Sequence, residues 1–201
     1  MIDSFVSSYE DIRPRLVFRC ALREGHPARL VLETRDFGDP AAVLVYDPPD
    51  APAAADTLRL PEAEPPYRGA PIVEGEDLDG DGWTDLRVMT FHGSGGHMFD
   101  VFRYAPARHR FEKDTVLSGA GNLHRVGAAC VRDSWAMGAG SWSSRDRCLR
   151  NGRWVATRYE REEYSSALST GDVPVSIHET LELRGGRMRV VRLDTVRERF
   201  R

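Results

Sequence analysis

The stretch of sequence that decides the fold is Asp77–Phe91, which reads DLDGDGWTDLRVMTF. Its first nine residues place aspartates at alternate positions around two glycines, so several carboxylates can turn inward on one hard cation. Its last six residues, Leu86–Phe91, alternate in the manner of a strand, which argues against a helix at this point. The stretch therefore predicts a metal-binding loop that runs directly into a β-strand.

Calcium is the expected ion, because it takes six to eight oxygen ligands and tolerates a flexible geometry, whereas magnesium demands a strict octahedron. Gly82, at the sixth position of the loop, allows the sharp turn that such a loop needs. The predicted ligands are four carboxylates and one backbone carbonyl: Asp77, Asp79, Asp81, Asp85 and the carbonyl of Trp83. A structural role is expected for the ion, since no open coordination position or neighbouring base is evident.

The same residues have two other possible interpretations. An EF-hand is excluded, because its twelfth position requires a bidentate glutamate and Val88 occupies that position here. A solvated acidic turn that holds no ion remains the alternative to the calcium loop.

Outward from this loop, helical periodicity is almost absent, whereas period-two alternation and turn signals recur along the chain. Asn151-Gly152 predicts a type I′ hairpin, because both central positions need positive φ, and Gly185-Gly186 predicts a second tight hairpin. Thirteen strands are predicted: Arg15–Leu22, Arg29–Thr34, Ala42–Tyr46, Thr57–Leu60, Asp85–Phe91, Met98–Tyr104, Arg110–Lys113, Leu123–Val131, Ser134–Met137, Asp146–Arg150, Arg153–Arg161, Ser176–Arg184 and Arg187–Asp194.

These patterns predict a single all-β domain over residues 1–201, built of short antiparallel strands as a propeller, sandwich or barrel. The proline-rich segment 47–71 is expected to be a surface connection within it.

Composition narrows the function classes. The chain has 201 residues and a formal net charge of −3, which argues against binding nucleic acid through bulk charge. No apolar run approaches the ~20 residues of a membrane-spanning helix. From Asp36 to Asp85 there are 13 acids and two arginines, whereas from Leu86 onward there are 13 acids and 20 bases. This asymmetry favours a local negative field on one surface, unless the two regions cancel in the fold.

Three cysteines bear on the cellular compartment. If the segment between Cys130 and Cys148 is a long hairpin, the two residues lie at matching heights on adjacent strands and can form a disulfide. Such a bridge requires an oxidising compartment, with Cys20 left as a buried thiol. Three reduced thiols in a cytosolic protein are the alternative. No signal peptide is recognisable in Met1–Glu10, so we expect either a cytosolic protein or a mature segment.

The segment from Glu74 to about Tyr159 resembles the bacterial lysozyme-inhibitor-like immunity proteins. The resemblance rests on the acidic loop and its strand, on Gly93–Gly96, on the aromatic segment Phe99–Pro106 and on RNGRW at 150–154. It implies a small five-bladed β-propeller-like domain that binds calcium, with the β-sandwich kept as the alternative fold. It also implies a periplasmic or lipid-anchored protein that neutralises peptidoglycan hydrolases delivered by type IV secretion.

The family inhibits by inserting a loop residue, often a tyrosine, into the cleft of the enzyme. This chain has no tyrosine in Met137–Ser144, so Trp142 is the residue expected to act as the plug. A core position for Trp142, with the glycines forming only a tight turn, is the competing interpretation. The residues expected to contact the partner are Ser141, Trp142, Ser143, Arg145, His92 and His97.

Taken together, these features predict a binding protein and no enzyme, because no nucleophile elbow, zinc-protease motif or paired glycosidase carboxylates is recognisable. The expected function is calcium-stabilised inhibition of a lysozyme-type peptidoglycan hydrolase in the periplasm. We expect no membrane-spanning segment and no nucleic-acid partner, and a lipid anchor in the precursor is left open. A calcium-binding adhesion-like or glycan-binding propeller module without inhibitor activity is the alternative function.

Overall fold

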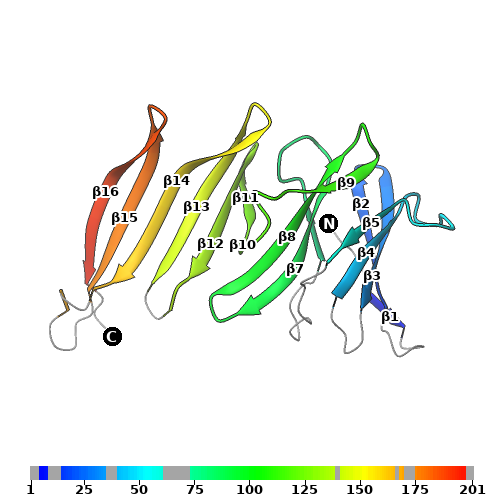
Figure 1. Cartoon of the computed structure of the whole chain (residues 1–201), viewed down its shortest axis with the longest axis horizontal. Helices are drawn as coiled ribbons and strands as arrows, with labels where there is room; N and C mark the ends of the chain where they lie inside the picture. Colours follow the sequence, from blue (N-terminus) through cyan, green and yellow to red (C-terminus); the bar gives the residue numbers. More distant parts are fainter. Residues whose placement is uncertain are drawn as a thin grey trace. The chain divides into compact units, whose positions relative to one another are not determined.

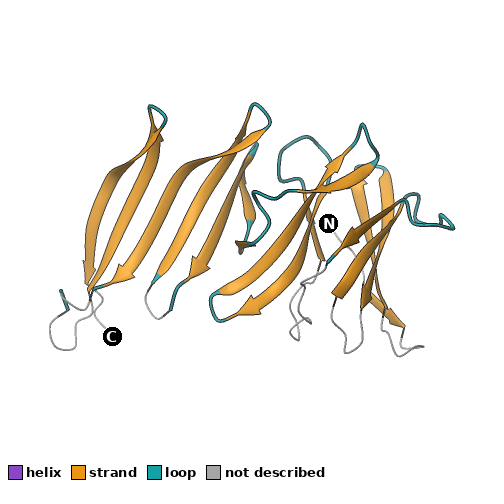
Figure 2. Cartoon of the chain, viewed as in Figure 1, coloured by secondary structure: helices purple, strands orange, loops and turns teal. Residues whose placement is uncertain are grey.

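The structure is a computed structural model that describes residues 5–8, 15–34, 40–60, 73–138, 141–165, 168–169 and 175–197. Within these residues it contains sixteen strands, and neighbouring strands pair antiparallel (Figures 1 and 2). No helix in this part of the chain is long and apolar enough to cross a membrane. The predicted all-β class is confirmed.

The chain divides into two compact units, each of which is described by itself. Unit 1 comprises residues 1–92 and 97–119, and it holds two sheets. The first is a meander of five strands in sequence order: β1 (Phe5–Ser8), β2 (Arg15–Arg23), β3 (His26–Thr34), β4 (Pro40–Tyr46) and β5 (Asp56–Arg59). In the second, β6 (Val73–Glu76), β7 (Asp85–Gly93) and β8 (Gly96–Ala105) lie side by side, and β9 (Arg110–Lys113) pairs with β8.

The core of unit 1 lies between these two sheets. Period-two alternation turns one face of each strand inward, so the first sheet contributes residues such as Leu30 and Val43, and the second contributes Leu86, Val88 and Phe102. Leu30, Val43, Leu86 and Val88 are all 0% exposed. Fully burying a side chain of this size contributes about 1.5–3 kcal/mol, so the apolar contact holds the two sheets together.

Unit 2 comprises residues 93–96 and 120–201. It begins with the short strand β10 (Ala120–Gly121) and continues as a six-stranded meander in sequence order. Its strands are β11 (His124–Gly127), β12 (Cys130–Ala136), β13 (Trp142–Arg150), β14 (Arg153–Tyr164), β15 (Val175–Arg184) and β16 (Arg187–Arg197). Both predicted hairpins are present. Asn151 and Gly152, in the turn between β13 and β14, have φ of 50° and 74°. Gly185 and Gly186, in the turn between β15 and β16, have φ of 57° and 76°, so all four residues have the positive φ that such turns need.

Much of the sheet in unit 2 has no buried core. None of the residues of β14 is buried, and Ser144 is the one buried residue of β13. Ion pairs between neighbouring strands take over part of the stabilisation. Arg132 binds Asp146 through two hydrogen bonds of 2.6 and 2.9 Å, and Arg161 binds Glu179 at 2.7 Å. Arg132–Asp146 is partly buried, whereas exposed pairs such as Arg161–Glu179 contribute at most about 1 kcal/mol each, so unit 2 depends on many small terms.

The disulfide prediction is confirmed. Cys130 and Cys148 are direct partners on β12 and β13 and are joined by a disulfide. Cys20 is a free, buried cysteine on β2, as expected, and burial raises the pKa of its thiol to about 11. The bridge closes 18 residues of sequence around the β12–β13 turn, so it constrains the unit that contains Trp142.

The propeller expectation needs correction, because the described strands form three open sheets and no closed ring of blades. Unit 1 fits the alternative, a β-sandwich. The physical reason is local to unit 2, where two-residue turns join β13 to β14 and β15 to β16, and β14 pairs with β15, so these strands form one continuous sheet that does not divide into separate four-stranded blades. The predicted connection 47–71 includes β5, and its residues 61–71 lie outside the described part of the chain. The prediction of one domain stays a prediction.

Candidate functional site

The acidic loop curls around the side chain of its first aspartate. Asp77 Oδ1 accepts hydrogen bonds from the backbone N–H groups of Gly80 at 2.8 Å and Asp81 at 3.1 Å, and its Oδ2 accepts one from Gly82 at 3.2 Å. Gly80 and Gly82 have φ of 80° and 87°, a region that glycine occupies without steric cost. The sequence thus folds into a tight loop because one carboxylate binds its backbone and two glycines allow the bend.

Asp85 begins β7 at the far end of the loop and is buried, with 1% of its surface exposed. Its Oδ1 accepts the backbone N–H of Tyr104 and its Oδ2 that of Leu78, both at 3.0 Å. The pKa of Asp85 is raised to about 8, mainly by burial and also by the charge of Asp79, although the two N–H donors act to lower it. A carboxylate in this position needs either a proton or a cation close by.

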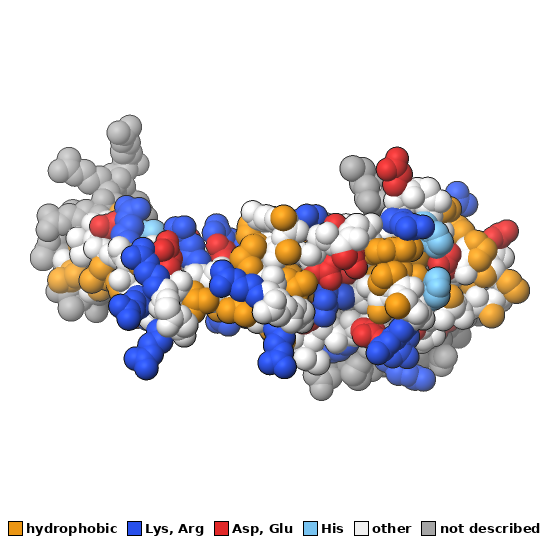
Figure 3. Space-filling view, turned by 90° about the horizontal axis from the view of Figure 1, so that it is seen from above, with side chains coloured by type: hydrophobic (Ala, Val, Ile, Leu, Met, Phe, Trp, Pro, Cys, Tyr) orange, Lys and Arg blue, Asp and Glu red, His pale blue; other side chains and the backbone are white. Residues whose placement is uncertain are grey.

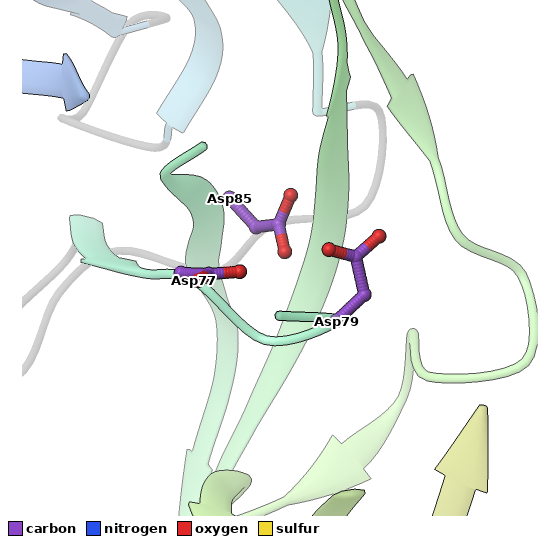
Figure 4. A group of neighbouring side chains, drawn as sticks. All are labelled: Asp77, Asp79 and Asp85. Carbon is purple, nitrogen blue, oxygen red and sulfur yellow. The ribbon is translucent and has the colours of Figure 1, made fainter. Parts of the chain in front are cut away.

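Three of the predicted ligands converge. Asp77, Asp79 and Asp85 each offer an oxygen, and these oxygens lie within 4.8 Å of one another (Figure 4). Calcium binds oxygens at about 2.3–2.6 Å, so two oxygens on opposite sides of one ion lie about 5 Å apart. The spacing and the all-oxygen donor set therefore fit a hard divalent cation.

The other two predicted ligands have different surroundings. Asp81 is exposed and does not belong to the converging group, and its Oδ1 accepts the backbone N–H of Trp83 at 2.8 Å. Although Asp81 is exposed, partial loss of water around its carboxylate is the main cause that raises its pKa, followed by the charges of Asp79 and Asp77, whereas the N–H of Trp83 lowers it. Ligation by Asp81 and by the carbonyl of Trp83 stays a prediction.

The loop is fastened to both sheets of unit 1. Thr84 donates its N–H to the carbonyl of Leu22 at 2.6 Å and its hydroxyl to the carbonyl of Ala21 at 2.8 Å, both on β2. The Trp83 ring stacks on Tyr104 of β8, with ring centroids 4.8 Å apart. An ion in this loop would therefore strengthen a junction between the first and second sheets.

Sequence reasoning missed the cation that already lies beside the loop. Arg103 of β8 donates from Nη1 to Asp79 Oδ2 at 3.1 Å, and its Nε lies 2.8 Å from Asp114 Oδ2 in an ion pair. Arg103 follows Asp79 by 24 residues, and only the pairing of strands brings the two together. No local motif signals such a contact.

The predicted partner-contacting residues fall in two places. His92 is the penultimate residue of β7 and His97 the second residue of β8, with Nδ1 atoms 2.9 Å apart and stacked rings whose centroids are 4.7 Å apart. Ser141 precedes β13, and Trp142, Ser143 and Arg145 are part of it.

Trp142 is half-buried at the first position of β13. Its Nε1 donates to Glu162 Oε2 at 3.0 Å, and its ring centroid lies 5.8 Å from that of His178. Glu162 and His178 were not predicted, because they reach Trp142 only through the cross-strand pairing of β13, β14 and β15. Ala139 and Gly140, at the tip of the predicted plug, lie outside the described residues.

No protein-family model matches the sequence, and no curated protein matches it. Among solved structures, the chain is similar to one described as a Xanthomonas type IV secretion system related protein, with a TM-score of 0.51. The two chains are 15% identical, and the match covers 96% of this chain and 97% of the other. At this level of identity, the likeness concerns the fold.

Proposed function

We propose that this chain is a calcium-stabilised binding protein that inhibits a lysozyme-type peptidoglycan hydrolase and acts as an immunity protein. The observation that carries the proposal is the convergence of Asp77, Asp79 and Asp85 in one tight loop. The fold supports the proposal as well, because it is similar to that of a protein related to type IV secretion. The protein has no catalytic role in this proposal.

Calcium has a structural task in this proposal. When bound, the ion supplies positive charge that offsets the mutual repulsion of the aspartates and replaces the proton of Asp85. Residues of the loop then connect the bound ion to the neighbouring strands through hydrogen bonds. Asp85 holds the backbone of Tyr104 and Leu78, and Thr84 holds that of Leu22. The ion thereby stabilises the junction of the two sheets.

Recognition is assigned to Trp142 and its neighbours. Trp142 belongs to the residue types that most often dominate binding energy at interfaces. Its hydrogen bond to Glu162 holds the indole, and the Cys130–Cys148 bridge joins its own strand, β13, to the neighbouring strand β12. A contact residue that is already ordered loses less conformational entropy on binding.

The disulfide supports an extracytoplasmic location, because such bridges persist in oxidising compartments. A periplasmic location is the specific form of this proposal, and it matches the place where a peptidoglycan hydrolase acts.

The test is a cell-wall lysis assay with two enzymes, hen egg-white lysozyme and a hydrolase encoded beside the gene. The protein should suppress lysis by at least one of them in calcium, and less in chelator. Trp142→Ala should weaken inhibition by about tenfold or more. Trp154→Ala is the matched control, since Trp154 is a half-buried tryptophan on β14 of the same unit. Undiminished lysis by both enzymes, together with binding to a glycan array, would replace the inhibitor with a glycan-binding module.

A further inference from the structure

A second group of side chains in unit 1 has the composition of a recognition surface. Arg23 and His26 flank the β2–β3 turn, Asp47 follows β4, Trp83 belongs to the acidic loop and Tyr104 lies on β8. Figure 3 shows hydrophobic side chains gathered beside histidine and arginine side chains on this unit. None of these five residues belongs to the predicted partner-contacting set.

Three of the five form an ordered stack, which we call the Arg23 stack: Arg23, Trp83 and Tyr104. The guanidinium carbon of Arg23 lies 4.4 Å from the centroid of the Trp83 ring, and that ring stacks on Tyr104. Tyr104 is 5% exposed, so the base of the stack is embedded in the sandwich, whereas Arg23 is exposed at its outer end. The indole therefore supports the guanidinium at the exposed end of the stack.

The guanidinium of Arg23 has no acceptor of its own within the described part of the chain. The carboxylate of Asp47 is engaged by His26, whose Nε2 lies 3.0 Å from Asp47 Oδ2. Asp56 is engaged as well, since its Oδ2 accepts the backbone N–H of Phe111 at 2.7 Å. Among the described residues the donors of Arg23 are thus unused, although two acidic side chains lie near enough to influence Tyr104 electrostatically.

A planar guanidinium with free donors matches one chemical group best, a carboxylate bound through two parallel hydrogen bonds. Phosphate-rich polymers and anionic membranes fit less well, because unit 1 carries 21 acidic and 13 basic residues, a net charge of −8. That field repels a polyanion but still allows one carboxylate on a neutral or basic protein. Lysozyme-type hydrolases carry carboxylates in the cleft where the glycan is cleaved.

We infer that Arg23, held on Trp83, binds a carboxylate in the substrate cleft of the hydrolase. This inference rests on the proposed function and adds to it a second contact residue, independent of Trp142. Because Trp83 belongs to the acidic loop and donates its N–H to Asp81, closure of that loop on an ion also orders the Arg23 stack. Calcium would then act on recognition as well as on stability.

The experiment compares inhibition constants of three variants against the enzyme that the unchanged protein inhibits. Arg23→Ala should weaken inhibition by about tenfold or more, since hydrogen bonds to charged groups are among the stronger contacts. Arg23→Lys should recover only part of the loss, because it keeps the charge but not the planar fork. Arg59→Ala is the matched control, an exposed arginine of the same unit, and should change inhibition less than about twofold.

The pairing itself is tested by replacing each of the two catalytic carboxylates of the hydrolase in turn by its amide and measuring affinities by calorimetry. If Arg23 binds one of them, Arg23→Ala should cost far less affinity against that amide enzyme than against the original. Equal loss against the original and both amide enzymes, or no loss with Arg23→Ala, would overturn the inference and leave the proposed function standing. Failure of the unchanged protein to inhibit any hydrolase would overturn both.

Discussion

Removing calcium at different pH values should change the stability of this protein in a manner dictated by Asp85. Its folded-state pKa of about 8 lies above the ordinary value of 3.8, so the protonated side chain is the form that the ion-free fold favours. The stability that Asp85 contributes to the ion-free protein is present below pH 3.8 and is lost as the pH rises toward 8. The melting temperature of the chelated protein should therefore fall over this range.

Calcium should act in the opposite sense, because it binds the ionised carboxylate. Below pH 8, each unit of pH lowers the ionised fraction about tenfold, so the apparent affinity at pH 6 should be about a hundredfold weaker than above pH 8. At a calcium concentration a hundred times the dissociation constant at high pH, the ion stabilises the fold by about 2.7 kcal/mol. For a chain of this length, that corresponds to a rise of roughly 5–11 °C in melting temperature. The same calcium concentration at pH 6 should give only about 0.4 kcal/mol, a rise of roughly 1 °C.

The assay is thermal unfolding followed by circular dichroism at pH 6 and pH 8.5, in calcium and in chelator. Asp79→Asn should abolish the calcium-dependent rise, whereas Asp50→Asn, at an exposed aspartate outside the loop, should retain it. The same rise at both pH values would refute the role of Asp85, and no rise at either would refute the metal site.

Two further predictions concern unit 2. Replacing Cys130 and Cys148 together by serine should lower the free energy of unfolding of unit 2 by about 3 kcal/mol, as read from urea titration; an unchanged midpoint would show that the bridge is dispensable. Gly95→Ala should destabilise the protein by roughly 1–3 kcal/mol, because the added Cβ would lie 2.5 Å from the backbone oxygen of Ala136. Gly127→Ala, whose Cβ would make an ordinary 3.5 Å contact with Cys130, should cost less than about 0.5 kcal/mol, and equal melting temperatures for the two variants would contradict this assignment.

Features with local causes could be predicted from the sequence. Asn151-Gly152 forms a hairpin because of its own backbone preferences, and the predicted strand Arg110–Lys113 has the observed bounds. The spacing of Cys130 and Cys148 predicted their register, because a hairpin of that length places them opposite each other. The acidic loop likewise brings Asp77 and Asp79 together through bonds within nine residues.

Features that depend on weak turn signals or on the pairing of distant strands could not be predicted from the sequence. Leu123–Val131 was interpreted as one strand, but the chain turns at Ala128–Ala129 and divides it between β11 and β12. Two alanines carry no turn preference, so the break has no local signature. The strand β6 was missed because it has only four residues, of which Val73 alone is buried. The contacts of Arg103 with Asp79 and of Trp142 with Glu162 arise from strand pairing between distant segments, which no periodicity encodes.

The strands from β13 onward have a consequence for how this protein can change over time. Their side chains are mostly half exposed, and ion pairs such as Arg161–Glu179 replace a packed interior. A mutation on either broad surface of that meander alters what is displayed to a partner but opens no cavity, so its energetic penalty stays small. In unit 1, Leu86 and Val88 are fully buried, so replacing either by a smaller residue would open a cavity and lower the stability. The sequence of unit 1 is thus constrained by its core, whereas the surface of the strands from β13 onward can change its binding specificity without loss of the fold.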